Sequence, residues 1–178
     1  MKKLSYFLPL FIVAIIGCSE DKREADKGSS EKAVAPIMEK FSLFPVVPPV
    51  LGQFPFVDGG QCYVDLINNK KADNNIFSIK PGSGFSIAGW AIDEKKQNSP
   101  EVVVLKLAAK TQSYYSLLSR YDRPDLVKGA GKPEYLKGGY TGQVNIGSLP
   151  SGEYEIQLVQ KTTENNLVCS TNRKLVLQ

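Results

Sequence analysis

The sequence contains no histidine among its 178 residues. Histidine is the commonest general base and the commonest metal ligand in proteins, so its absence excludes Ser-His-Asp and Cys-His catalysis and any histidine zinc site. The chain also lacks a phosphate-binding loop and a dinucleotide fingerprint. Carboxylates are present, but no spacing singles out a pair of them for glycoside hydrolysis. We therefore predict a protein that is not an enzyme and that uses no metal and no cofactor.

Long apolar stretches are also lacking. The apolar run at residues 4–16 has thirteen residues and is interrupted by Ser5 and Pro9. A helix needs about 20 apolar residues to cross a bilayer. Two lysines precede this short run, which is typical of a signal peptide, so we expect residues 1–17 to be a targeting segment.

The end of this segment, Ile15-Ile16-Gly17-Cys18, resembles the bacterial lipobox, with Ile15 where leucine is usual. The resemblance implies cleavage before Cys18 and attachment of diacylglycerol and a further acyl chain, such as palmitate, to that cysteine. Stable anchoring requires two or more acyl chains, and this modification supplies them. Ser19 stands where an aspartate would retain a lipoprotein at the inner membrane, which implies the outer membrane within the cell envelope. A transmembrane anchor that happens to contain a cysteine is the alternative.

Removal of residues 1–17 leaves 161 residues, enough for one domain with a substantial core. The mature chain has 20 basic and 18 acidic side chains, a net charge of +2, which gives no support to a nucleic-acid partner. With Cys18 lipidated, Cys62 and Cys169 remain as an even pair in a compartment that permits disulfides. We predict a bridge between them, with two buried free thiols as the alternative.

Two segments precede the predicted domain. Residues 18–40 are rich in Ser, Glu, Asp and Lys, so we expect a disordered tether. Residues 41–60 begin with a Phe/Pro-rich segment, residues 41–56, which contains four phenylalanines and four prolines. The prolines exclude a regular helix or a central strand and favour extended backbone. This segment could pack against the domain, dock a partner or the membrane surface, or be disordered.

From residue 61 onward the pattern favours β-structure, because short runs of β-forming residues alternate with turn signals. Strands are expected at residues 61–67, 76–80, 84–93, 102–109, 114–118, 139–146, 154–162 and 167–177. Adjacent Tyr114 and Tyr115 should face opposite sides of their strand, one in the core and one exposed. One helical turn is expected at residues 123–128, with Pro124 at its first position. The predicted fold is all-β, a single sandwich over residues 61–178 with about seven or eight strands, immunoglobulin-like or jelly-roll-like.

Four local motifs stand out. They are Cys62-Tyr63-Val64-Asp65-Leu66-Ile67-Asn68, Gly89-Trp90-Ala91-Ile92-Asp93, Arg123-Pro124-Asp125-Leu126, and Gly138-Gly139-Tyr140 leading to Leu149-Pro150-Ser151-Gly152-Glu153-Tyr154. Their order resembles a bacterial β-sandwich module found as an extracytoplasmic appendage of glycosyltransferase-type membrane proteins and as a stand-alone envelope domain. Leu126-Val127 and Tyr140 depart from the usual Val-Ala and Phe of this module but keep the apolar character. The resemblance covers about residues 61–178 and implies fold and location, not an activity.

Several side chains are candidates for ligand binding. Trp90 is either a sheet residue with a paired indole N–H or a platform on which a sugar stacks. Asp93 and Arg123 are expected to form a charge-assisted pair that holds a loop to the helical turn, with a ligand site as the alternative. Asp125 suits the start of a helix, and the loop tyrosines Tyr121, Tyr135 and Tyr140 are compatible with glycan binding.

The resulting hypothesis is a membrane-anchored, non-catalytic binding or scaffolding module of the cell envelope, with a glycan or another envelope protein as ligand. A first alternative is a structural or assembly lipoprotein that docks a partner through residues 41–56. A second is a small hydrolase that uses carboxylates only.

Overall fold

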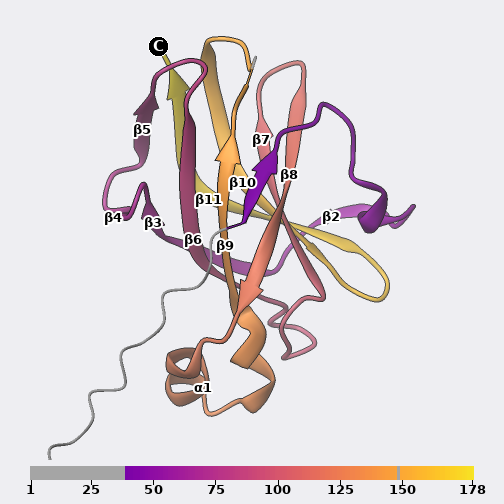
Figure 1. Cartoon of the computed structure of the whole chain (residues 1–178). Coiled ribbons are helices and arrows are strands. Elements are labelled where there is room, and N and C mark those ends of the chain that lie inside the picture. Colours follow the sequence, from indigo (N-terminus) through magenta and orange to yellow (C-terminus); the bar gives the residue numbers. More distant parts are fainter. Residues whose placement is uncertain (1–38, 148) are drawn as a thin grey trace, which may run out of the picture. The chain divides into compact units, whose positions relative to one another are not determined.

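A computed structural model describes residues 39–147 and 149–178 and shows a mostly β protein with one short helix, as predicted (Figure 1). The eleven strands are β1 (Lys40–Ser42), β2 (Phe56–Asp58), β3 (Gln61–Ile67), β4 (Lys70–Lys71), β5 (Ile76–Ile79), β6 (Gly84–Ile92), β7 (Val102–Ala108), β8 (Ser113–Tyr121), β9 (Gly139–Asn145), β10 (Gly152–Lys161) and β11 (Asn166–Leu177). All eight predicted strands are present. The number of strands exceeds the predicted seven or eight because the sequence did not indicate β1, β2 and β4, each of two or three residues.

The predicted signal peptide, the lipobox with Cys18 and nearly all of the tether lie outside the described residues. Within the described ranges, no helix is long and apolar enough to cross a membrane.

The strands form one mixed sheet in the order β2-β11-β10-β7-β8-β9-β6-β3-β4, with β1 beside β9 and β5 beside β11. Strand β8 connects the two halves of this order. Its Leu118 pairs with Val103 of β7, while Ser119 pairs with Thr141 of β9. The two halves can therefore turn their inner faces toward each other while sharing one strand.

Both halves contribute side chains to one core. Val64 and Ile87, from β3 and β6, belong to the same buried cluster as Leu105 and Leu158, from β7 and β10. Alternating residues on these strands point inward, as the period of two requires. Close packing of both faces around this cluster supplies the main apolar burial of the fold.

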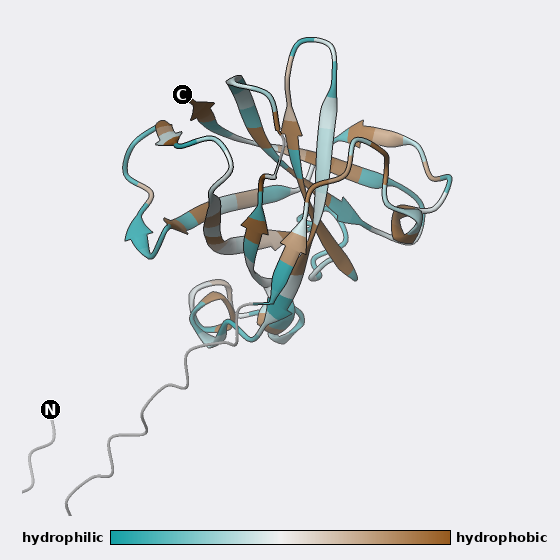
Figure 2. Ribbon diagram, turned by 45° about the horizontal axis from the view of Figure 1, so that its top comes forward, coloured by the Kyte–Doolittle hydropathy of each residue, from teal (hydrophilic) through white to brown (hydrophobic). Residues whose placement is uncertain are grey.

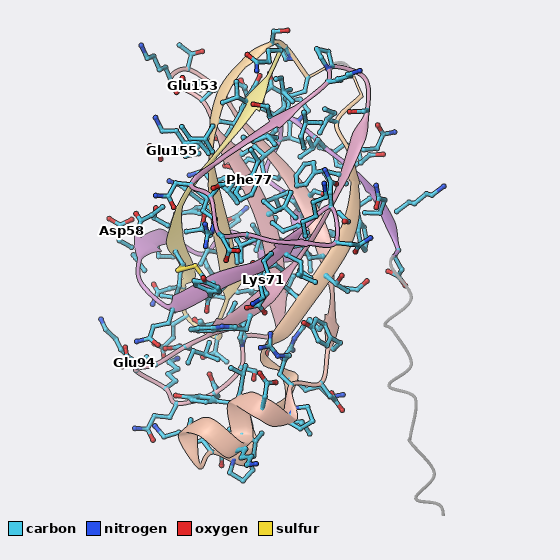
Figure 3. The ribbon with its side chains drawn as sticks, turned by 90° about the vertical axis from the view of Figure 1, so that its left-hand side faces the viewer. Asp58, Lys71, Phe77, Glu94, Glu153 and Glu155 are labelled. Carbon is cyan, nitrogen blue, oxygen red and sulfur yellow. A yellow bond between two sulfur atoms is a disulfide. The ribbon has the colours of Figure 1, made fainter. Side chains whose placement is uncertain are left out.

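The predicted disulfide is present. Cys62 of β3 and Cys169 of β11 are bonded across a sequence separation of 107 residues, and the bond is drawn in yellow in Figure 3. It joins two strands that lie near opposite ends of the strand order, and so holds the two halves of the sheet together.

The Phe/Pro-rich segment packs against the sheet. It contributes β1, a 3₁₀ turn η1 (Pro49–Leu51) and β2, and Figure 2 colours much of it brown for hydrophobic residues. Leu51 is fully buried and forms a second cluster with Val104, Tyr115 and Val159 on the outer side of the sheet. Because this cluster covers Tyr115 while Tyr114 packs against the main core, the expectation that one of the two tyrosines is exposed is wrong.

The predicted helical turn is α1 (Pro124–Ala130), with Pro124 in its first turn and Gly131 in the left-handed conformation after its end. Proline suits this start because its missing N–H would have no helical partner there. A 3₁₀ helix, η2 (Pro133–Gly138), follows and leads into β9. In Figure 1 both helical elements lie at one end of the strands, and this end carries the candidate site.

Candidate functional site

The four motifs of the sequence meet at the end of the sheet near α1. Strand pairing places Tyr63 opposite Trp90, Trp90 opposite Gly139, and Gly139 opposite Tyr121. Residues directly opposite in adjacent strands project from the same face. Tyr63, Trp90 and Tyr121 therefore form one row across β3, β6 and β8 on the outer face, which we call the aromatic row.

The first two rings of the aromatic row are stacked and accessible. The Tyr63 and Trp90 ring centroids are 6.4 Å apart with an interplanar angle of 21°. Tyr63 is 46% exposed, and Trp90 is partly exposed. Among the hydrogen bonds of residues 39–147 and 149–178, none is donated by the Trp90 indole N–H, and its nitrogen is not one of the buried polar atoms that lack a partner, so this donor can reach a ligand.

Gly139 leaves a gap in the row that Arg123 fills. A methyl group on Gly139 would lie 2.8 Å from Cγ of Arg123 and 2.9 Å from Cε1 of Tyr121. The Arg123 stem and the Tyr121 ring thus both occupy the space above this glycine, beside Trp90. Only glycine permits that approach, which explains why a glycine precedes Tyr140 in its motif.

Arg123 binds two carboxylates with its three guanidinium nitrogens. Its Nη1 donates to Oδ2 of Asp65 over 2.6 Å, and its Nε and Nη2 donate to the two oxygens of Asp125 over 2.8 and 2.6 Å. Asp65 lies at a bulge where the pairing of β3 with β6 shifts between Val64 and Leu66. A bulge re-aims side chains, and here it brings the Asp65 carboxylate to Arg123. Arg123 therefore ties β3 to the start of α1.

The predicted pair between Asp93 and Arg123 is wrong. Asp93 is buried and stabilises its own turn, because its Oδ1 accepts a hydrogen bond from the Lys96 backbone N–H and its backbone bridges to Asn98. Asp93 and Arg123 each lie beside a turn in the sequence. The carboxylate that Arg123 binds is instead that of Asp65, which the bulge in β3 brings close to it.

The charges at this site are strongly coupled. Hydrogen bonds with Asp125, and then with Asp65, raise the pKa of Arg123 despite its partial burial. The same guanidinium lowers the pKa of Asp125. Burial raises the pKa of Tyr121, although Arg123 opposes this effect. At neutral pH the site thus presents an ionised Asp125, whose side chain is 61% exposed, beside the neutral phenol of Tyr121.

Two predicted tyrosines do not reach the aromatic row. Tyr140 is fully buried beneath it, where its hydroxyl donates to the Tyr63 backbone carbonyl over 2.9 Å. Burial raises the pKa of Tyr140 well above its ordinary value. Tyr135 is buried in η2, with the Lys132 ammonium 5.4 Å from its ring centroid. Both residues support the site from below or beside it.

Sequence reasoning missed Tyr63, Asp65 and Arg173. Tyr63 and Asp65 belong to the Cys62 motif, and their alternation with buried Val64 could have placed them on the outer face. Arg173, which is 7% exposed, lies with its guanidinium carbon 5.3 Å from the Tyr63 ring centroid and donates to the Asn74 carbonyl. Its cation–π contact supports the Tyr63 ring, and no local signal in the sequence indicates it.

The arrangement suits noncovalent recognition. In the part of the chain that the structure describes, no group of three or more Cys, Asp or Glu residues could hold a metal ion. Comparison of the chain with protein families, with curated proteins and with solved structures finds no match. The resemblance to an envelope β-sandwich module therefore stays a prediction, and the site must be interpreted from its own chemistry.

Proposed function

We propose that the protein is a lipid-anchored, non-catalytic binding module of the bacterial cell envelope, and that its aromatic row binds a glycan. The anchor is Cys18, and Ser19 favours the outer membrane. The domain is best classified as a β-sandwich, because both halves of its sheet pack on one core. The single observation that carries the binding proposal is the aromatic row itself.

The chemistry of the row matches a sugar ring. A pyranose has a face of C–H groups that stacks on aromatic rings, and hydroxyls at its edge that need donors and acceptors. Tyr63 and Trp90 offer adjacent, nearly parallel rings. The Trp90 indole N–H and the exposed Asp125 carboxylate supply a donor and an acceptor. A row of this kind across three strands favours an extended chain over a small molecule enclosed in a cleft.

The carboxylates at the row argue against the hydrolase alternative. A glycosidase requires one carboxyl group with a raised pKa to protonate the leaving group. Here Asp65 and Asp125 share the same guanidinium, and Arg123 lowers the pKa of Asp125. Arg123 holds them as acceptors and as structural links, which suits binding better than acid catalysis.

The test is binding to an array of bacterial envelope glycans, including peptidoglycan fragments and lipopolysaccharide oligosaccharides. The protein is the mature chain with Cys18→Ala. Trp90→Ala should reduce binding by about tenfold or more, because a stacked aromatic contact is lost. Trp90→Phe should keep part of the binding, because it retains a ring.

Ile76→Ala is the matched control, since Ile76 is exposed on β5 outside the row. Its binding should equal that of the parent chain. Failure of the parent chain to bind any glycan on the array, or equal loss of binding in the Trp90 and Ile76 variants, would refute the proposal.

A further inference from the structure

Exposed apolar side chains are concentrated on the Phe/Pro-rich segment. We define the outer apolar patch as the exposed large hydrophobic residues of this segment and its neighbours: Phe44, Val46, Val47, Val50, Phe54, Phe56, Val57 and Leu117. Elsewhere among the described residues, only Tyr63 and Ile76 are exposed large hydrophobics. Single exposed apolar residues are ordinary, but a contiguous set marks an interaction surface.

The patch is held in a fixed conformation. Phe44 and Tyr115 exchange two backbone hydrogen bonds of 2.9 and 2.8 Å. The buried Asn166 side chain donates to the carbonyls of Leu51 and Phe54, and Leu51 is fully buried below the segment. With its ends paired to the sheet as β1 and β2, the segment cannot turn its apolar side chains inward. A rigid patch loses little conformational entropy when it binds.

The patch also lacks negative charge. From Lys40 to Val57 the sequence contains no acidic residue, and Asp58 is the first. Glu39, Lys40 and Asp58 border this stretch, and the absence of charge within it suits contact with the apolar part of a bilayer.

We propose that the outer apolar patch rests on the lipid bilayer that carries the anchor. This inference depends on the proposed anchoring at Cys18. Only 21 residues separate Cys18 from Lys40, where β1 begins. Even a fully extended chain of that length reaches only about 75 Å. The chain from the proposed anchor enters the domain at β1, four residues before Phe44 of the patch, so its length allows the patch to rest on the bilayer.

The bilayer fits better than a second copy of the chain. Anchoring keeps the patch at a high effective concentration beside lipid, so a weak apolar contact suffices. The contact also has a consequence for the aromatic row. The patch covers the outer side of β7, β8 and β10, whereas the row crosses the outer side of β3 and β6 and reaches only the end of β8 at Tyr121. Because these halves pack on a common core, a domain resting on its patch presents the row away from the membrane.

The test measures partition of the lipid-free mature chain, with Cys18→Ala, into vesicles of phosphatidylethanolamine and phosphatidylglycerol. At a high lipid concentration, which replaces the effective concentration that the anchor would give, the parent chain should co-sediment with the vesicles. Phe44→Ser combined with Val46→Ser should lower the partition coefficient by about tenfold or more, because these side chains are 54% and 64% exposed. Ile76→Ser is the matched control, since Ile76 is 58% exposed on β5, and should leave partition unchanged.

A second measurement reports insertion directly. Trp90 is the only tryptophan, so Val46→Trp in a Trp90→Phe background places one fluorophore in the patch. Brominated lipids should quench its fluorescence, and should not quench that of Trp90 in the parent chain.

Three results would overturn the inference. The first is that the parent chain does not partition into the vesicles. The second is that Ile76→Ser lowers the partition coefficient as much as Phe44→Ser combined with Val46→Ser. The third is that light scattering shows a dimer which Phe44→Ser combined with Val46→Ser dissociates. Thermal unfolding of each variant checks that it is folded. Palmitate labelling of Cys18 in cells tests the anchor separately. An unlabelled chain that still binds vesicles would refute the anchor and leave the patch in place.

Discussion

Gly89 is the position where one added methyl group should do the most damage to the site. It precedes Trp90 in β6 and faces the core beneath the aromatic row. A Cβ at Gly89 would lie 2.0 Å from the Tyr63 carbonyl oxygen and 2.5 Å from the Tyr140 hydroxyl. Neither neighbour can move freely, because the carbonyl belongs to the backbone of β3 and Tyr140 is fully buried. Gly89→Ala should therefore separate β3 from β6 at the row.

The cost follows from three contributions. Overpacking a well-packed interior costs about 1–3 kcal/mol. Loss of the hydrogen bond from Tyr140 to the Tyr63 carbonyl adds about 1 kcal/mol. Replacing a strand glycine by alanine returns about 0.5–1 kcal/mol of conformational entropy. The net loss is roughly 1–3.5 kcal/mol from a free energy of unfolding of about 5–15 kcal/mol.

Urea unfolding of the oxidised mature chain measures this loss. With a slope of about 2 kcal/mol per molar urea, the midpoint should fall by roughly 0.5–2 M. Gly129→Ala is the control, because Gly129 in α1 has no atom within 4 Å of its added Cβ, and this variant should be unchanged or slightly more stable. Gly89→Ala with Tyr140→Phe should cost less than the two single changes together, since one clash disappears. A Gly89→Ala midpoint equal to that of the parent chain would refute the packing argument.

Two further predictions concern the disulfide and the buried phenol. Replacing Cys62 and Cys169 by serine should lower the free energy of unfolding by about 4–5 kcal/mol in urea titrations, from the loop of 107 residues. A loss below about 1 kcal/mol would contradict that estimate. Burial raises the pKa of Tyr140, so its contribution to stability is complete below the ordinary tyrosine pKa of about 10 and is lost as the pH rises above it. Tyr140→Phe should flatten this alkaline decline of unfolding free energy, and an unchanged slope would contradict the assignment.

Much of the fold could be predicted because its signals are local. Short runs of β-forming residues between turn signals located every longer strand, and Pro124 located the start of α1. The cysteine count predicted the pairing of Cys62 with Cys169, because two thiols allow only one bridge once Cys18 is assigned to lipid. The motifs also identified Trp90 and Arg123, two residues that the structure places at one site.

The partners of these residues could not be predicted, because they depend on register and on contacts distant in sequence. The bulge in β3 brings Asp65 to Arg123, 58 positions away, whereas Asp93 had an equally plausible local context. The cover over Tyr115 likewise comes from a segment that lies about seventy positions earlier in the chain, so strand periodicity alone predicted that one of Tyr114 and Tyr115 is exposed. The sequence by itself determined which residues alternate between the two faces of a strand and which cysteines pair. Only the tertiary structure decided which residues pack against each face of the sheet, because packing depends on the distances between strands and not on their order in the chain.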